Sequence, residues 1–184
     1  MFFSCNKNID GCLNTEACNY DPDANTDDGS CYYSESTNDW SIQIIASMQP
    51  WMNFETIFDE NNVLGVSDSA SDNFDSLDIP EPPPSLSNWI SGYFYHPEWD
   101  SIFGDNFTQE YKSNQFCGTK DWNFMVKANS PGPMELLFIF DNVPDSIQIS
   151  LISDESVEIS DSLVVNSMLE ENVEKEFLIK IDIN

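Results

Sequence analysis

Apolar and polar residues alternate along much of the chain, with the period of two that is typical of strands with one buried face. The alternation is clearest in 121–128, 146–152 and 177–184. Apolar residues at helical spacing are nearly absent, and only 165–175 could form a short helix. Shorter apolar runs predict further strands at 40–47, 62–66, 89–95, 134–140, 157–159 and 163–165.

The short strands are separated by Asp, Asn, Ser, Pro and Gly, which predicts a mainly-β fold. We expect residues 38–184 to form an antiparallel β-sandwich of immunoglobulin-like or jelly-roll-like type. A parallel sheet would need crossover helices, which the pattern does not provide. Residues 1–36 contain few large apolar side chains and predict a small module stapled by disulfides. Residues 67–88 form a long connection rich in Ser, Asp and Pro, which is usually functional or mobile.

The charge balance narrows the possible partners. The 184 residues include 33 acidic but only 6 basic residues, so the formal net charge is -27. This excludes nucleic acid, because phosphates are bound by clustered Lys and Arg, and it excludes electrostatic docking on an anionic membrane. Hydrophobic residues make up 40% of the chain, enough for a core. We therefore expect a folded protein whose self-repulsion is lowered by bound cations or salt.

Cysteine usage indicates an oxidising compartment. Four of the five Cys, at positions 5, 12, 18 and 31, lie within a polar N-terminal segment, and the fifth is Cys117. Such a cluster is typical of a disulfide framework. Zinc is the alternative, but zinc sites favour closely paired cysteines supported by histidine, and the single His is at position 96.

The first residues offer two interpretations of Cys5. Phe2-Phe3-Ser4-Cys5, followed by polar residues, resembles the end of a lipoprotein signal of the Bacteroidetes, and this resemblance implies that Cys5 is lipidated. The alternative is that Cys5 is one more disulfide cysteine. In the first case the membrane is reached only through the lipid anchor, because no stretch is long and apolar enough to span a bilayer.

Oxygen-bearing side chains recur at alternate positions between Cys18 and Cys31. Calcium takes about six to eight oxygen ligands, which a curled acidic loop can supply. The loop is not an EF-hand, because Thr26 stands where that motif needs glycine. The alternative is a turn-rich segment whose Asp and Asn side chains cap their own backbone. The candidate calcium ligands are Asn19, Asp21, Asp23, Asn25, Asp27 and Asp28.

Two segments resemble known protein families. Gly11-Cys12, Asn19-Tyr20, Pro22, Ala24 and the string 27–31 (DDGSC) match a short module of secreted and surface proteins of marine Bacteroidetes, although Leu13-Asn14 replaces its usual Thr-Asp. Residues 40–184 are similar to an uncharacterised β-sandwich domain of Bacteroidetes secreted proteins that precedes a type IX secretion sorting domain. The segments that carry this resemblance are 64–66, 72–75, 78–83, 93–94, 96–99, 121–124 and 177–180. The resemblances imply an extracellular or outer-membrane surface location.

The module resemblance also implies a disulfide pairing. Its consensus does not always have Cys at position 18, so Cys12 should pair with Cys31. If Cys5 is unmodified, Cys5–Cys18 is the second expected bridge and Cys117 is free. If Cys5 is lipidated, the four remaining cysteines allow two bridges, one of which can tie the module to Cys117.

The long acidic connection and the loop tryptophans suggest a ligand site. Flat aromatic rings beside carboxylates suit sugar rings, through stacking and hydrogen bonds to hydroxyls. The alternatives are a solvated acidic loop, since Asp or Glu stands at every third position from 72 to 81, and tryptophans that belong to the core. The candidate ligand-binding residues are Trp51, Trp89, Trp99, Asp75 and Asp78.

We do not expect an enzyme. His96 is the only histidine, and none of the usual nucleophile, zinc-protease or phosphate-loop motifs is present. The expected function is that of a non-catalytic, cation-stabilised extracellular or cell-surface protein that acts in adhesion or ligand binding, with a glycan or surface protein as partner. The alternatives are a carbohydrate-binding accessory lipoprotein for glycan capture and, less favoured, a hydrolase with paired carboxylates.

The first prediction is that calcium stabilises the protein. Millimolar Ca2+ should raise the melting temperature beyond NaCl of equal ionic strength, because binding at a hundredfold excess over Kd adds about 2.7 kcal/mol to the free energy of unfolding. Replacing Asp21, Asp23 and Asp27 by Asn should remove most of the difference. Identical melting curves in calcium and in matched NaCl would contradict the prediction.

Overall fold

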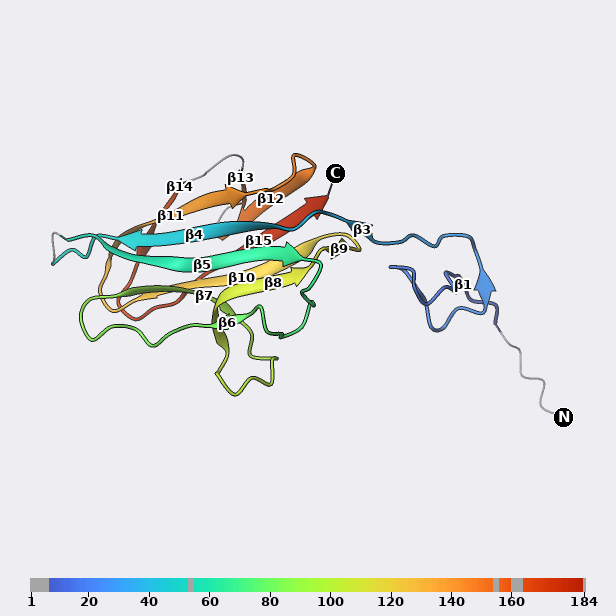
Figure 1. The fold of residues 1–184 in the computed structure, drawn as a ribbon, viewed down its shortest axis with the longest axis horizontal. Coiled ribbons are helices and arrows are strands. Elements are labelled where there is room, and N and C mark those ends of the chain that lie inside the picture. The colour runs from blue at the N-terminus through green and yellow to red at the C-terminus, as the bar shows by residue number, and fades with distance from the viewer. Residues whose placement is uncertain (1–6, 53–54, 154–155, 160–163, 184) are drawn as a thin grey trace.

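The computed structural model describes residues 7–52, 55–153, 156–159 and 164–183, and these residues form strands, turns and loops without a helix. The mainly-β class predicted from the sequence is therefore confirmed (Figure 1). The short helix considered at 165–175 is wrong. Its first half lies in strand β14 (Val164–Leu169), paired with β11 (Gly132–Asp141), and strand β15 (Lys175–Ile183) begins after a turn.

The large sheet has eleven strands. Their order is β13-β12-β15-β10-β7-β8-β5-β4-β11-β14, with β6 paired to β8 outside this path. The bounds of those not given above are β4 Trp40–Met48, β5 Ile57–Ser67, β6 Ile79–Pro80, β7 Ile90–Tyr95, β8 Asn106–Ser113, β10 Lys120–Ala128, β12 Ile147–Ile152 and β13 Ser156–Ile159.

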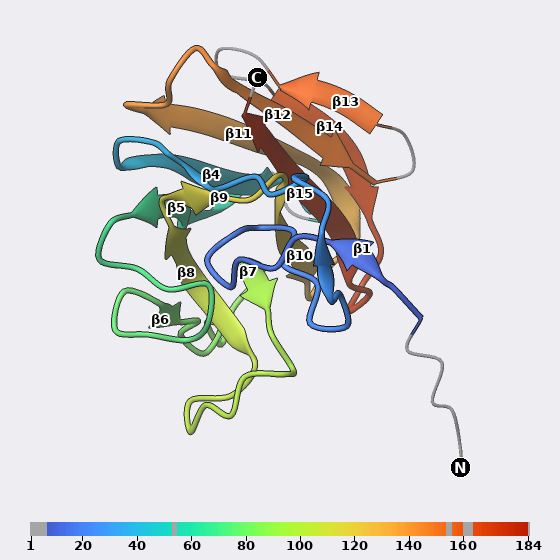
Figure 2. The same cartoon turned by 90° about the vertical axis from the view of Figure 1, so that its right-hand side faces the viewer.

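The sheet curls so that its two halves enclose the core, as the view along the strands shows (Figure 2). In β4 every second residue from Trp40 to Met48 is buried, which is the alternation seen in the sequence. Trp40 of β4 and Trp122 of β10 meet across the core, with ring centroids 6.4 Å apart. The ladder is continuous from β13 to β14, so the finer prediction of a two-sheet sandwich is not confirmed.

Strand β8 was not predicted, and it makes the only parallel pair of the large sheet among the described residues, with β5. Two of its buried positions are occupied by the polar residues Thr108 and Glu110, so the strand lacks the alternation of apolar and polar residues on which the prediction relied. The connection between the parallel strands, residues 68–105, crosses through β6 and β7. Strands thus replace the crossover helix that a parallel pair was expected to need.

The N-terminal module is held by covalent bonds and a short ladder. Cys12 is bonded to Cys31, as the module consensus implies, and Cys18 is bonded to Cys117. The alternative Cys5–Cys18 pair is therefore wrong, and Cys5 lies outside the described residues. Strand β3 (Glu35–Ser36) pairs with β9 (Gln115–Phe116), so the end of the module is hydrogen-bonded to the sheet domain.

Within the module, β1 (Asp10–Gly11) pairs with β2 (Thr26–Asp27). Cys12 and Ala17 are the buried hydrophobic residues of its described part, so its interior consists largely of the disulfide. The module lies beyond the end of the curled sheet at which β15 ends (Figure 1). A segment with so small a core depends on its staples for stability.

The second prediction follows from the bridge to Cys117. Replacing both Cys18 and Cys117 by Ser should lower the free energy of unfolding by about 2–4 kcal/mol, because the bridge closes a loop with a sequence separation of 99 residues. Chemical denaturation measures this loss, and limited proteolysis should show earlier cleavage before residue 40. Non-reducing peptide mapping that joins Cys18 to any cysteine other than Cys117 would contradict the prediction.

Candidate functional site

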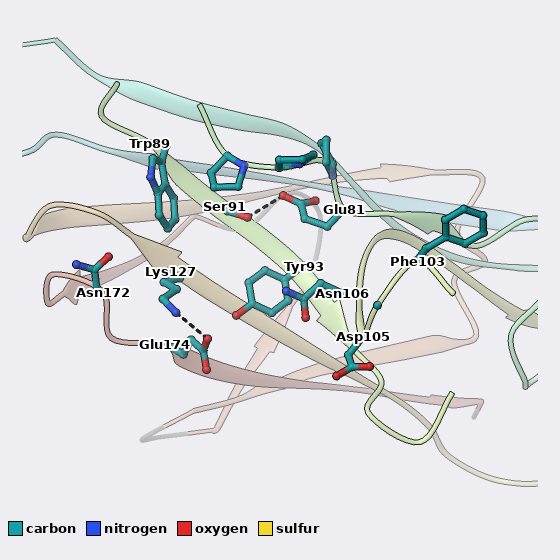
Figure 3. Close-up of a pocket in the computed structure, with 14 residues that line it drawn as sticks. Glu81, Trp89, Ser91, Tyr93, Phe103, Asp105, Asn106, Lys127, Asn172 and Glu174 are labelled. Carbon is teal, nitrogen blue, oxygen red and sulfur yellow. Dashed lines mark hydrogen bonds and ion pairs between the residues drawn. The ribbon is translucent and has the colours of Figure 1, made fainter. Parts of the chain in front are cut away.

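A groove with a volume of about 560 Å³ lies over β7 and β10. One wall is formed by Pro82, Pro83 and Pro84, and further lining comes from residues 103–106 at the start of β8 and from Asn172 and Glu174 between β14 and β15. Figure 3 shows the lining side chains, with Tyr93 near the middle. The lining combines aromatic rings with hydrogen-bonding groups, contributed by Glu81, Trp89, Ser91, Tyr93, Phe103, Asp105, Asn106, Lys127, Asn172 and Glu174.

The alternation of β7 separates groove residues from core residues. Ile90 and Phe94 point into the core, whereas Ser91 and Tyr93 line the groove, and Trp89 lines it just before the strand begins. The Trp89 backbone N–H donates to Asn129 Oδ1 at 2.9 Å, which fixes the start of the strand. The same two-residue period that builds the core therefore aligns two aromatic rings on the groove side.

A second set of groove residues comes from the neighbouring strand and turn. Lys127 of β10 lies opposite Ser91 in the register of β7 and β10, and its Nζ is 3.0 Å from Glu174 Oε1. Hydrogen bonding to Lys127 lowers the pKa of Glu174, so this carboxylate stays ionised. Burial and the Glu174 carboxylate raise the pKa of Tyr93, so its phenol remains a neutral hydrogen-bonding group.

A cleft with a volume of about 380 Å³ adjoins the groove. Glu81, Trp89 and the proline wall line both hollows, and Asp59 lines only the cleft. Burial raises the pKa of Glu81 to about 7, and the nearby Asp59 carboxylate adds to the rise, while Ser91 and Thr108 oppose it. Glu81 therefore takes up a proton at a higher pH than an exposed glutamate does.

The five residues expected to bind a ligand are not gathered in one place. Of the candidate tryptophans, Trp89 lines the groove, whereas Trp51 lies between β4 and β5 with 67% of its surface exposed. Trp99 stacks on the His96 ring, with centroids 3.7 Å apart, and packs against the core.

Asp75 and Asp78 accept hydrogen bonds from backbone N–H groups. Asp78 accepts hydrogen bonds from the N–H groups of Asp75 and Tyr111 at 2.8 and 3.0 Å, and Asp75 accepts from Ser71 and Leu77. These bonds hold the acidic connection against β8. The two-residue alternation of β7 could have indicated Tyr93 as a further ligand-binding candidate, because it lies on the same face as Trp89. No sequence signal places Lys127 or Glu174 beside Tyr93.

Three acidic residues of the module cap their own turns. The carboxylates of Asp21, Asp27 and Asp28 each accept a hydrogen bond from the backbone N–H two residues ahead, at 2.9, 3.0 and 2.9 Å. Asn19 and Asn25 bond to backbone groups of the module. In the part of the chain that is described, no group of three or more His, Cys, Asp or Glu is gathered to hold a metal. Calcium binding in the module stays a prediction.

A buried charge network crosses β8. The Glu110 side chain is fully buried, with His96 Nε2 at 2.9 Å and Lys112 Nζ at 3.2 Å from its two carboxylate oxygens. The other ring nitrogen of His96 lies 2.7 Å from Glu98. Both imidazole nitrogens are thus engaged with carboxylates, an arrangement that neutralises Glu110 and offers no free nitrogen to activate a nucleophile.

Comparison with known proteins assigns no family to the chain: no family model, no curated protein and no solved structure matches it. Among the described residues no helix is long and apolar enough to cross a membrane.

The third prediction concerns pH. Burial alone would lower the pKa of His96, but hydrogen bonds and charges from Glu110 and Glu98 raise it above its usual value. The folded state therefore holds the proton more tightly than the unfolded state, in which the imidazole has a pKa of about 6.5. This stabilisation is complete below that pH and is lost as the pH rises through the folded pKa.

Replacing His96 by Gln should flatten the decline of unfolding free energy above about pH 6.5 and cost about 3 kcal/mol at pH 6, because Glu110 loses one of its two cations. Denaturant unfolding of both proteins from pH 5 to 9 measures the effect. Glu98→Gln is the control, since its side chain is 63% exposed and should change the profile much less. Parallel pH profiles for wild type and His96→Gln would contradict the prediction.

Proposed function

We propose that this protein is a non-catalytic binding protein of an extracellular or cell-surface compartment, and that its groove captures a glycan. The observation that carries the proposal is the alignment of Trp89 and Tyr93 on the groove side of β7, facing the polar groups of Lys127, Glu174 and Asn172. Aromatic faces stack on the C–H surfaces of sugar rings, and carboxylates and amides bond to their hydroxyls.

The charge of the chain supports a neutral or amino-bearing glycan. The groove is lined by three acidic residues, Glu81, Asp105 and Glu174, against the single cation of Lys127, on a protein with a formal net charge of -27. Uronic or sulfated sugars would meet an unfavourable potential. The two disulfides favour an oxidising compartment, and lipidation of Cys5 is part of the same proposal for a surface location.

The fourth prediction tests the groove with purified protein on a glycan array and by calorimetry with the best neutral glycan. Trp89→Ala and Tyr93→Ala should each weaken binding at least about tenfold, because a buried aromatic contact is worth about 1.4 kcal/mol or more. Trp51→Ala is the matched control and should bind as wild type, since Trp51 is exposed and lies outside the groove.

Two outcomes would contradict the proposal. Undiminished binding by the Trp89→Ala and Tyr93→Ala variants would remove the groove as the site. Turnover of a chromogenic glycoside panel, abolished by Glu81→Gln, would show a hydrolase instead of a binding protein.

A further inference from the structure

Polar side chains of β5 and of the connection after β6 lie beside two consecutive residues of β7, Ser91 and Gly92. The Gly92 N–H donates to Asp59 Oδ2 at 2.7 Å, and the Ser91 hydroxyl donates to Glu81 Oε1 at 2.7 Å. A Cβ at position 92 would lie 2.9 Å from Asn62 Nδ2, so the absence of a side chain at Gly92 gives room for the Asn62 amide. Asp59 and Asn62 thus lie at Gly92, and Glu81 lies at the adjacent Ser91, close enough to Asp59 for the two charges to interact.

The hydrogen-bonding capacity of this cluster is not met by the protein. Asn62 has no exposed surface, and neither its Oδ1 nor its Nδ2 has a hydrogen-bond partner among the described residues. Glu81 Oε2 is also buried without a partner. The Thr108 hydroxyl lies close enough to lower the pKa of Glu81, but it is not in hydrogen-bond geometry. A buried polar group without a partner destabilises the folded state, so an additional partner would stabilise the fold.

The cluster also lacks a counter-charge. No ion pair among the described residues joins Asp59 or Glu81 to a Lys or His. The donors are two carboxylates, a carboxamide and hydroxyls, all of them oxygen ligands of the kind that hard cations prefer. Cys and His, which zinc favours, are absent from the residues named here. The cleft lined by Asp59, Glu81 and Trp89 gives access from solvent.

We propose that Asp59, Asn62 and Glu81 bind a calcium ion, with the Thr108 hydroxyl beside it. A divalent cation neutralises the two carboxylates and supplies the partner that Asn62 Oδ1 and Glu81 Oε2 lack. The ion joins β5, which carries Asp59 and Asn62, to the connection that carries Glu81 and the proline wall. The site is separate from the acidic turns of the module, and it does not depend on whether the groove binds a glycan.

The fifth prediction is tested on the full chain, stripped of metal by EDTA and dialysis, with Ca2+ alone as the probe. Wild type and the triple variant Asp21→Asn, Asp23→Asn, Asp27→Asn should both bind Ca2+ by calorimetry and melt at a higher temperature than in NaCl of equal ionic strength. The triple variant keeps only the calcium response of the proposed site. The double variant Asp59→Asn, Glu81→Gln should lack this part of the calcium binding and of the rise in melting temperature. Asp105→Asn, Glu174→Gln is the matched control and should keep it.

A second measurement avoids changing the ligands, in case the double variant does not fold. Tb3+ replaces Ca2+ at oxygen sites and emits when a nearby tryptophan transfers its excitation energy. Tb3+ emission excited through tryptophan should fall at least severalfold in Trp89→Phe and stay unchanged in Trp51→Phe, and Ca2+ should displace the signal. Equal emission from the two variants would overturn the proposal.

Two further results would also overturn it. A calcium response that vanishes in the triple variant and persists in the double variant would assign the only cation site to the module. No calcium response in wild type would show that calcium does not compensate Asp59 and Glu81. No glycan is present in these experiments, so their failure is distinct from failure of the proposed function.

Discussion

The structure depends on the neutralisation of Glu110 inside the curled sheet. Strand β8 pairs in parallel with β5 and antiparallel with β7, so it joins the two halves of the sheet into one ladder. A fully buried carboxylate costs several kcal/mol unless it is paired. His96 and Lys112 contact both oxygens of Glu110, which makes their ion pairs a condition for β8 to occupy this position.

The same strand positions the surface on which the proposed function rests. Asp78 accepts the Tyr111 N–H of β8, which holds the acidic connection against the sheet just before β6. Glu81 then accepts the Ser91 hydroxyl, and the prolines that follow form the wall shared by the groove and the cleft. The groove is therefore a consequence of β8 pairing and of the buried polar contacts along the connection.

The carboxylates of this acidic protein are compensated in different ways in different parts of the fold. Glu110 and Glu174 are compensated by cationic side chains, and the module carboxylates by backbone N–H groups and solvent. Glu81 has no cationic partner among the described residues, and its buried Oε2 has no hydrogen-bond partner there. The module itself adds no large core, and the Cys18–Cys117 bridge secures it to the sheet domain.

The sequence by itself determined the mainly-β class and the position of strands such as β4, β10 and β15, because alternation is a local signal that one buried face imposes. The resemblance to the surface-protein module implied the Cys12–Cys31 pair, and the sequence also made Trp89 a candidate for ligand binding. Only the tertiary structure decided the existence of β8. Its inward-facing Glu110 is paired with His96, which follows directly after β7. It likewise brought Asp59 and Asn62 to Gly92 and Glu81 to the adjacent Ser91, since these contacts depend on strand register and crossover, which no local pattern encodes.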